Sequence, residues 1–412
     1  MFKDKSLWLD SIFATLFVFL LMFGVQQLFV SVDVLDPIGD AVGDVEVTDV
    51  VFSQLRTQDP VPEERVVLVN IGDLNRAGIA EQIRILNKYS PKVIGIDARF
   101  FKHKSPELDS SLAEAFSRVE NMVIASKLEG YDSLTDGFGN VAMPIEPFLP
   151  HVKPGFANFI ATAEDQDQFK VVRTFSPSDE VKGERHMALA VMMAHLYDSA
   201  KTERFLARGN DVEVVNFIGN ALASNSYGNA KFPALDVEDV FNENFVPELI
   251  EGKIVLMGYM GSYLGDPSWD DKFFTPLNTQ YAGRTNPDMF GVIVHANIIA
   301  MILNENYIDT MSDLAEIITA FILGWINIFF FILIYRNLGR WYDGLTKVIQ
   351  LVEAILILVL MGVVFNTFDY KLNLGIGIAA VAFAGDSLEI YFGVVKNLFS
   401  AEGRKELFNI NR

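Results

Sequence analysis

The chain has 412 residues, half of them hydrophobic, no cysteine and a formal net charge of −20. Without cysteine it has no disulfides, no thiol nucleophile and no thiolate metal ligand. Its charge argues against nucleic-acid binding, because an acidic surface repels the phosphate backbone. Positive and negative side chains balance outside residues 31–313, so the whole acidic excess lies in the central part of the chain.

Four apolar stretches each approach the length of about 20 residues that a helix needs to cross a bilayer. They predict transmembrane helices at residues 12–32, 314–335, 348–365 and 372–395, the third being the shortest. The first stretch has an alternative interpretation as a cleaved signal peptide. Its apolar run is long and no clear small-residue cleavage site follows it, so we interpret it as an uncleaved anchor.

Cations that flank these stretches predict their orientation, because positively charged residues are retained in the cytoplasm. With four spans, the basic clusters at 3–5, 336–347 and 396–412 fall on one side of the membrane. This predicts a protein of the bacterial cytoplasmic (inner) membrane with short cytoplasmic ends, residues 1–11 and 396–412. Residues 33–313 would then lie in the periplasm or extracellular space.

Strand and helix patterns alternate along the predicted exported domain. Continuous apolar runs at 65–73, 91–97 and 122–125 predict buried strands, with helices between them at 80–88 and 111–119. This alternation is typical of parallel βαβ units. Further predicted strands and helices are 154–159, 171–175, 186–198, 212–218, 236–241, 253–258 and 292–303. The expected fold is an α/β domain with a mostly parallel sheet, plus an α-helical bundle of one N-terminal and three C-terminal transmembrane helices.

Residues 45–310 resemble the second class of CHASE domains (cyclases/histidine-kinases-associated sensory extracellular). The segments that carry the resemblance are Lys92–Phe100, Gly252–Gly258, Phe274–Pro276 and Met289–Asn297, the last containing Gly291-x-x-x-His295-Ala-Asn297. One span before the domain and three after it also match the family. The resemblance implies an extracytoplasmic sensory domain.

Two features depart from the family pattern. Asp165-Gln-Asp167 is followed by Gln168 where the family has glycine, so any role of that turn is in doubt. Family members commonly continue into a cytoplasmic kinase or cyclase, whereas this sequence stops soon after its fourth apolar stretch. All five histidines lie in the predicted exported domain, which excludes a cytoplasmic phosphoacceptor histidine in this sequence. The expectation is a stand-alone member without a kinase or cyclase.

Polar residues at predicted strand ends suggest a ligand crevice. Asp73, Asp97 and Gly258 each end a predicted parallel strand, with Asp266 close in sequence to the last of them. Ligands of open α/β sheets gather outside the carboxyl ends of the strands. In the alternative interpretation the two aspartates cap the following helices or tighten turns.

Two other motifs have structural and functional interpretations. Gly258-Tyr-Met-Gly261-Ser262 could be a phosphate loop, but without the lysine of a P-loop a tight turn is favoured. His295 is either a satisfied core side chain or a pH-responsive, ligand-touching group. Ser262, Asp266 and His295 contain the residue types of a hydrolytic triad, but no nucleophile elbow is present, so we expect no enzyme. No cofactor or metal is expected.

Four polar residues interrupt the C-terminal apolar stretches: Asn327, Glu353, Asp386 and Glu389. Ionisable groups within a membrane are costly and point to a function. They could pair inside the bundle, contact a partner's transmembrane helix or conduct ions. Small residues at 375–385 also allow close helix packing or homo-oligomerisation.

These features predict a membrane-anchored sensor that binds an unknown ligand or protein and signals through its helices to a separate membrane or periplasmic protein. The alternative is a non-sensing scaffold or docking subunit of a cell-envelope complex.

Overall fold

The computed structural model describes residues 5–29, 46–56, 59–132, 134–135, 137–159, 171–223, 230–278 and 286–399. The chain divides into two compact units: Asp44–Ile308, and Met1–Gly43 together with Asp309–Arg412. The Asp165–Gln168 segment and the C-terminal tail from residue 400 lie outside the described residues.

A seven-stranded sheet forms the centre of the first unit, with strand order β10-β1-β11-β2-β3-β4 and β5 paired with β3. Every neighbouring pair is parallel except β3 and β4. The apolar runs expected near 65–73, 91–97, 122–125 and 253–258 lie in β1, β2, β3 and β11. The strands are β1 Val66–Asn70, β2 Val93–Asp97, β3 Met122–Asp132, β4 Gly137–Ala142, β5 Lys153–Phe156, β10 Ala234–Leu235 and β11 Ile254–Gly258.

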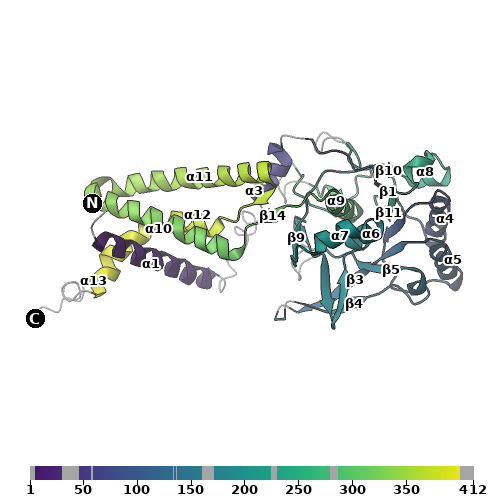
Figure 1. Cartoon of the computed structure of the whole chain (residues 1–412), viewed down its shortest axis with the longest axis horizontal. Helices are drawn as coiled ribbons and strands as arrows, with labels where there is room; N and C mark the ends of the chain where they lie inside the picture. Colours follow the sequence, from purple (N-terminus) through teal and green to yellow (C-terminus); the bar gives the residue numbers. More distant parts are fainter. Residues whose placement is uncertain are drawn as a thin grey trace, which may run out of the picture. The chain divides into compact units, whose positions relative to one another are not determined.

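Helices cover both faces of this sheet (Figure 1). On one face Ile94 and Ile96 of β2 share a buried core with Phe116 of α5. On the other face α6 lies so close to β2 that a Cβ at Gly95 would be 2.2 Å from the sulfur of Met193. The first group of helices is α4 Arg76–Asn87, α5 Pro106–Ser117 and α8 Val237–Phe241; the second is α6 Leu189–Tyr197, α7 Ser199–Leu206 and α9 Gly291–Asn304.

The middle of the domain differs from the sequence-based expectation. The predicted helix at 186–198 begins only at Leu189, because Glu184–Met187 forms a hairpin strand instead. The polar turn of this hairpin contains Lys182 and Gly183, both with positive φ. The predicted strands at 171–175 and 212–218 shorten to one two-residue antiparallel pair. The remaining elements are α3 Val47–Val50, η2 Val51–Leu55, η3 Leu149–His151, β6 Thr174–Phe175, β7 Ser178–Val181, β8 Glu184–Met187, β9 Glu213–Val214, η4 Pro247–Leu249, β12 Lys272–Phe273 and β13 Met289–Phe290.

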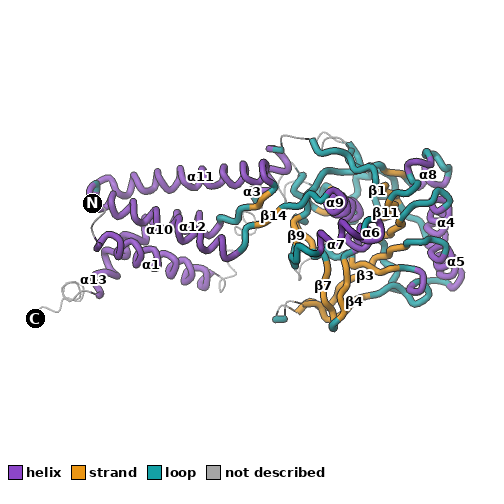
Figure 2. The backbone as a smooth tube through the Cα atoms, viewed as in Figure 1, coloured by secondary structure: helices purple, strands orange, loops and turns teal. Residues whose placement is uncertain are grey.

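The second unit is a helix bundle (Figure 2). Among the described residues, four helical segments are long and apolar enough to cross a membrane, one N-terminal and three C-terminal. The third is longer than its apolar core of 348–365 suggests, because polar residues extend the helix at both ends. The helices are α1 Lys5–Phe29, α10 Asp313–Asn337, α11 Tyr342–Phe368 and α12 Gly375–Ile390, with η5 Gly339–Trp341, η6 Tyr391–Val395 and α13 Lys396–Phe399.

A short parallel strand pair closes one end of the bundle. β14 (Asp309–Thr310), just before α10, pairs with β15 (Tyr370–Lys371) in the turn between α11 and α12. The amide of Asp309 also donates to the carbonyl of Asp369 at 3.0 Å. The segment that enters α10 is therefore hydrogen-bonded to the turn that joins α11 and α12.

Candidate functional site

Three central strands of the sheet end in one row. Asn70 of β1 pairs with Gly258 of β11, and Gly258 pairs with Asp97 of β2. Ligands of open α/β sheets bind outside this edge. The structure thus brings together Asp97 and Gly258 as expected, and it adds Asn70, which the sequence-based prediction did not include.

Asp97 has a buried histidine beside it. His295 lies near the start of α9, and its Nε2 is 3.9 Å from Oδ2 of Asp97; the exposed fractions of the two side chains are 2% and 17%. Neither ring nitrogen of His295 has a hydrogen-bond partner among the described residues. The described residues thus give no support to the interpretation of His295 as a satisfied core histidine. Because buried polar groups are nearly always hydrogen-bonded, this one has bonding capacity for another molecule.

Aromatic rings enclose the histidine. The ring of Phe159 lies 4.5 Å from the imidazole and 5.2 Å from the ring of Phe273, measured between centroids. A Cβ at Gly291 would be 3.1 Å from Phe273 and 3.7 Å from Oδ2 of Asp97. Glycine at this position therefore lets the first turn of α9 approach both side chains.

Burial controls the charge of these groups. It raises the pKa of Asp97 to about 7, with repulsion from Asp271 acting in the same direction and Arg99 opposing both. Burial also raises the pKa of Asp271 and lowers that of His295 to about 3. Near neutral pH the imidazole is uncharged, so it offers one donor and one acceptor, and Asp97 is close to its titration midpoint. Among the described residues no group of three metal-ligating side chains occurs. This arrangement suits a hydrogen-bonding polar ligand.

Asp73 and Asp97 do not cap the helices that follow them. Asn75 caps α4, accepting hydrogen bonds from the amides of Ala77 and Gly78 at 3.0 and 3.1 Å. Ser105 caps α5. The capping interpretation is wrong for both aspartates, and Asp73 is an exposed residue in the loop after β1.

The loop after β11 is a tight turn that hydrogen bonds to a side chain within the loop stabilise. Oδ2 of Asp266 accepts from the amide of Ser262 at 2.9 Å, and Oδ1 accepts from the amide of Ser268 at 2.8 Å. These bonds keep the pKa of Asp266 below its ordinary value. Gly261 has a φ of +92°, and a Cβ there would be 2.3 Å from Asp266. The carboxylate beside His295 is Asp97, so Ser262, Asp266 and His295 do not assemble as a triad.

Asn70 connects the loops of the row. Its Nδ2 donates to Oδ1 of Asp236 at 2.9 Å and to the carbonyl of Gly261 at 3.0 Å. Its Oδ1 accepts from the amides of Gly72 and Met260 at 3.0 and 2.9 Å. The side chain is fully buried, so it fixes the edge of the sheet from within.

A comparison with protein-family models identifies the domain: the model of the CHASE2 domain matches residues 14–334. The chain belongs to the CHASE2 domain family. This match confirms the resemblance inferred from the sequence, and CHASE2 domains are extracellular sensory domains. No curated protein and no solved structure matches the chain significantly.

Two of the segments that carry the CHASE2 resemblance meet in this site. Asp97 belongs to the Lys92–Phe100 segment and His295 to Met289–Asn297. Asn297 has a structural role. Its Oδ1 accepts a hydrogen bond from the amide of Ile218 at 2.8 Å, and its Nδ2 donates to the carbonyl of Gly219 at 3.0 Å.

The sequence-based prediction missed Asn70, Asp271, Phe159 and Phe273. Asn70 carried the same signal as Asp97, a polar residue at the end of an apolar strand. The other three have no local signal, because only the folded chain brings them to this edge.

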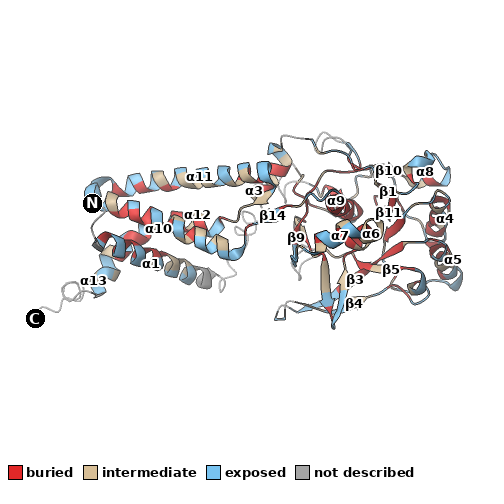
Figure 3. Cartoon of the chain, viewed as in Figure 1, coloured by how far each residue is buried: buried red, intermediate tan, exposed pale blue. Residues whose placement is uncertain are grey.

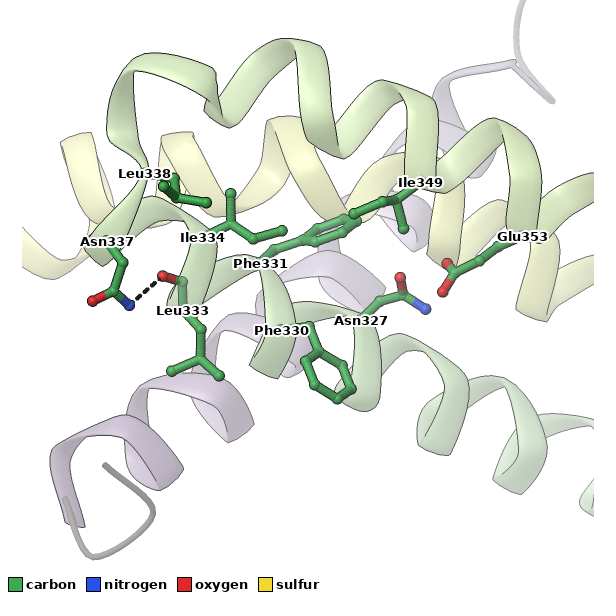
Figure 4. A pocket seen from close by; sticks show the side chains of 9 residues that line it. All are labelled: Asn327, Phe330, Phe331, Leu333, Ile334, Asn337, Leu338, Ile349 and Glu353. Carbon is green, nitrogen blue, oxygen red and sulfur yellow. Dashed lines mark hydrogen bonds between the residues drawn. The ribbon is translucent and has the colours of Figure 1, made fainter.

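The polar residues of the bundle have different surroundings. Lys347 of α11 donates to both carboxylate oxygens of Asp386 in α12 at 2.7 Å. Glu389 is exposed and close to Asp343. Glu353 of α11 and Asn327 of α10 face each other (Figure 4). Asp386 is thus paired with a cation inside the bundle, whereas Glu353 has a side-chain hydrogen bond with Asn327.

One buried carboxylate of the bundle was missed by the prediction. Asp10 of α1 is 7% exposed and accepts from Lys396 at 2.7 Å and from Arg336 at 3.0 Å. A lone aspartate near the start of an apolar helix looks like a flanking charge in sequence. In the structure it joins three segments of the bundle.

Proposed function

We propose that this protein is a membrane-anchored extracytoplasmic sensor. Its CHASE2 domain binds a polar ligand at the Asp97–His295 edge of the sheet, and its C-terminal helices transmit the signal to a separate protein. The observation that supports this proposal is the buried imidazole of His295, whose two nitrogens have no hydrogen-bond partner in the described part of the chain and which lies beside the carboxylate of Asp97 and the ring of Phe159.

The position of His295 in the chain favours signalling. Its helix, α9, ends at Asn304, and α10, the first of the C-terminal apolar helices, begins at Asp313. A ligand that bonds to His295 therefore acts on the helix that directly precedes the membrane-spanning part. Such a ligand shifts the balance between conformations only by the difference in its affinity for them.

The distribution of charged residues along the chain supports a location in the cytoplasmic membrane with the domain outside. The four apolar helices would cross the bacterial cytoplasmic membrane, with the basic loop 336–347 inside and the acidic domain outside. The positive-inside tendency supports this orientation.

A ligand screen on the full chain in detergent tests the proposal. Small amines, amino acids, organic acids and sugars would be scored by the rise in the melting temperature of the domain. A ligand at a hundred times its Kd should stabilise the folded state by about 2.7 kcal/mol. The same ligand should give little or no shift with Asp97→Asn or His295→Gln.

The matched control is Glu120→Gln, since Glu120 is exposed and precedes β3 at the opposite, amino edge of the parallel strands. It should leave the ligand-induced shift intact. A ligand that stabilises all three variants equally would place the binding site elsewhere. The absence of any stabilising ligand, with a protein partner held stably through the domain instead, would favour the scaffold function.

A further inference from the structure

A groove runs between α10 and α11 in the helix bundle. It has a volume of about 600 Å³ and nine lining residues, all labelled in Figure 4. Most of the lining is apolar, including Phe330, Phe331 and Ile334 of α10 and Ile349 of α11. Asn327 and Glu353 supply polar groups near one end.

The groove is open because α11 is attached mainly to α12. Gln350 donates to the carbonyls of Val381 and Ala382 at 2.8 and 3.0 Å, and the hydroxyl of Tyr342 donates to the carbonyl of Gly385 at 2.9 Å. These bonds hold one side of α11 on α12. Most of the rest of α11 is exposed (Figure 3).

Glu353 gives the groove a chemical preference. Its Oε2 is buried and has no hydrogen-bond partner among the described residues. Asn327, which faces Glu353, donates to the carbonyl of Leu323 at 3.1 Å and also forms a side-chain hydrogen bond with the carboxyl group of Glu353, so Oε2 is the oxygen that remains unbonded within the described part of the chain. Glu353 lies about 8 Å along the helix from Val348, where the apolar stretch begins. A carboxyl group at such a depth requires a hydrogen-bond donor or a cation.

The chain's own described cations do not supply this donor. Lys347 is paired with Asp386, and both Lys396 and Arg336 are paired with Asp10. Arg340 precedes α11, about 20 Å along the helix from Glu353. A second copy of this chain would present these same groups. These described cations are paired elsewhere or distant, and a basic side chain of a different membrane protein would complement Glu353.

We propose that this groove binds a transmembrane helix of a different membrane protein, which places a lysine or arginine against Glu353. Apolar side chains of that helix fill the space beside Phe330, Phe331 and Ile349. The inference rests on the proposed function insofar as this partner reads the sensor, but helix binding is measured without any ligand of the domain. Loss of ligand binding and loss of partner binding are thus separate results.

Site-directed photo-cross-linking of the full chain in native membranes tests this inference. A photoreactive phenylalanine analogue replaces Ile349, which lines the groove, or Leu351, which is 64% exposed and points to the other side of α11 at nearly the same depth. The Ile349 probe should give a discrete adduct whose cross-linked peptide is an apolar helix containing lysine or arginine. The Leu351 probe should give at least fivefold less of it.

Glu353→Gln in the Ile349-probe protein should reduce the adduct at least fivefold, while its amount in the membrane and its elution in size-exclusion chromatography stay unchanged. Glu353→Lys should also reduce the adduct, and replacing the partner's mapped cation with glutamate should restore it. An adduct with a second copy of this chain, with lipid alone, or with a helix that lacks a cation would overturn the proposal. So would equal adducts at the two probe positions, or an adduct that Glu353→Gln leaves unchanged.

Discussion

The carboxylate of Asp97 and the imidazole of His295 lie 3.9 Å apart, although one ends the second strand of the domain and the other begins its last helix. No hydrogen bond joins them, and burial moves the pKa of each toward the neutral form. Protonation therefore relieves the cost of burying the Asp97 carboxylate, whereas protonation of His295 is disfavoured.

The stability of the domain should depend on pH through these groups. Asp97 has a folded-state pKa of about 7, against about 3.9 in an unfolded chain, so the folded state binds more protons between these values. Its contribution to stability is lost as the pH rises through this window. Asp288, with a pKa of about 7, acts in the same direction. His295, with a pKa of about 3, acts oppositely, and its destabilising effect disappears above about pH 6.5.

Asp97→Asn should therefore weaken the decline in stability between pH 5 and pH 8. Hydrogen exchange of the β2 amides in the full chain measures the free energy of opening at each pH, after correction for intrinsic exchange rates. The control is Asp73→Asn, which changes an exposed carboxylate at the same edge. Parallel pH profiles for Asp97→Asn and the unmodified protein would contradict the raised pKa of Asp97.

Asn70→Ala should destabilise the domain by about 3 kcal/mol, because it leaves several buried backbone and carboxylate groups without their partner. Chemical denaturation followed by hydrogen exchange of β1 and β11 measures this loss. Asn121→Ala removes a single bond, to the carbonyl of Lys92, and should cost less than about 1 kcal/mol. Equal losses of stability in the two variants would contradict a larger structural role for Asn70 than for Asn121.

Asp10→Asn should destabilise the bundle by about 3 kcal/mol, since Lys396 and Arg336 lose a buried anionic partner. Titration with sodium dodecyl sulfate, followed by circular dichroism, measures the unfolding of the helices. Asp343→Asn should be neutral or slightly stabilising, because it removes a carboxylate close to Glu389. A loss of stability in Asp343→Asn as large as that in Asp10→Asn would contradict this account.

The orientation in the membrane can be measured against a cysteine-free background. Leu134→Cys, 94% exposed in the domain, should react with a membrane-impermeant maleimide on intact spheroplasts. Gly339→Cys lies between α10 and α11, where a Cβ meets no atom within 4 Å, and should react only after permeabilisation. The reverse pattern would invert the topology and remove the basis for an extracytoplasmic sensor.

Some features of this structure can be predicted from local sequence patterns. The apolar runs of β1, β2 and β11 and the four apolar helices depend on composition and length, so periodicity and hydropathy predict them. The position of Asp97 also follows from a rule, because the carboxyl ends of parallel strands share one edge.

Other features depend on tertiary contacts that no local pattern encodes. The partnership of Asp97 with His295, and that of Asp10 with Lys396, join residues far apart in the chain. The helix expected at 186–198 starts late because His186 pairs with Asp179 in a hairpin, and tertiary pairing overrides helical spacing there.

The pairing of β14 with β15 has a mechanical consequence. Thr310 precedes α10, and its strand partner Lys371 lies in the turn between α11 and α12, so the chain leaving the domain is hydrogen-bonded to the segment that joins these two helices. A displacement of that segment is therefore shared among the ends of α10, α11 and α12. Both walls of the groove at Glu353 are thus linked to the same pair of strands.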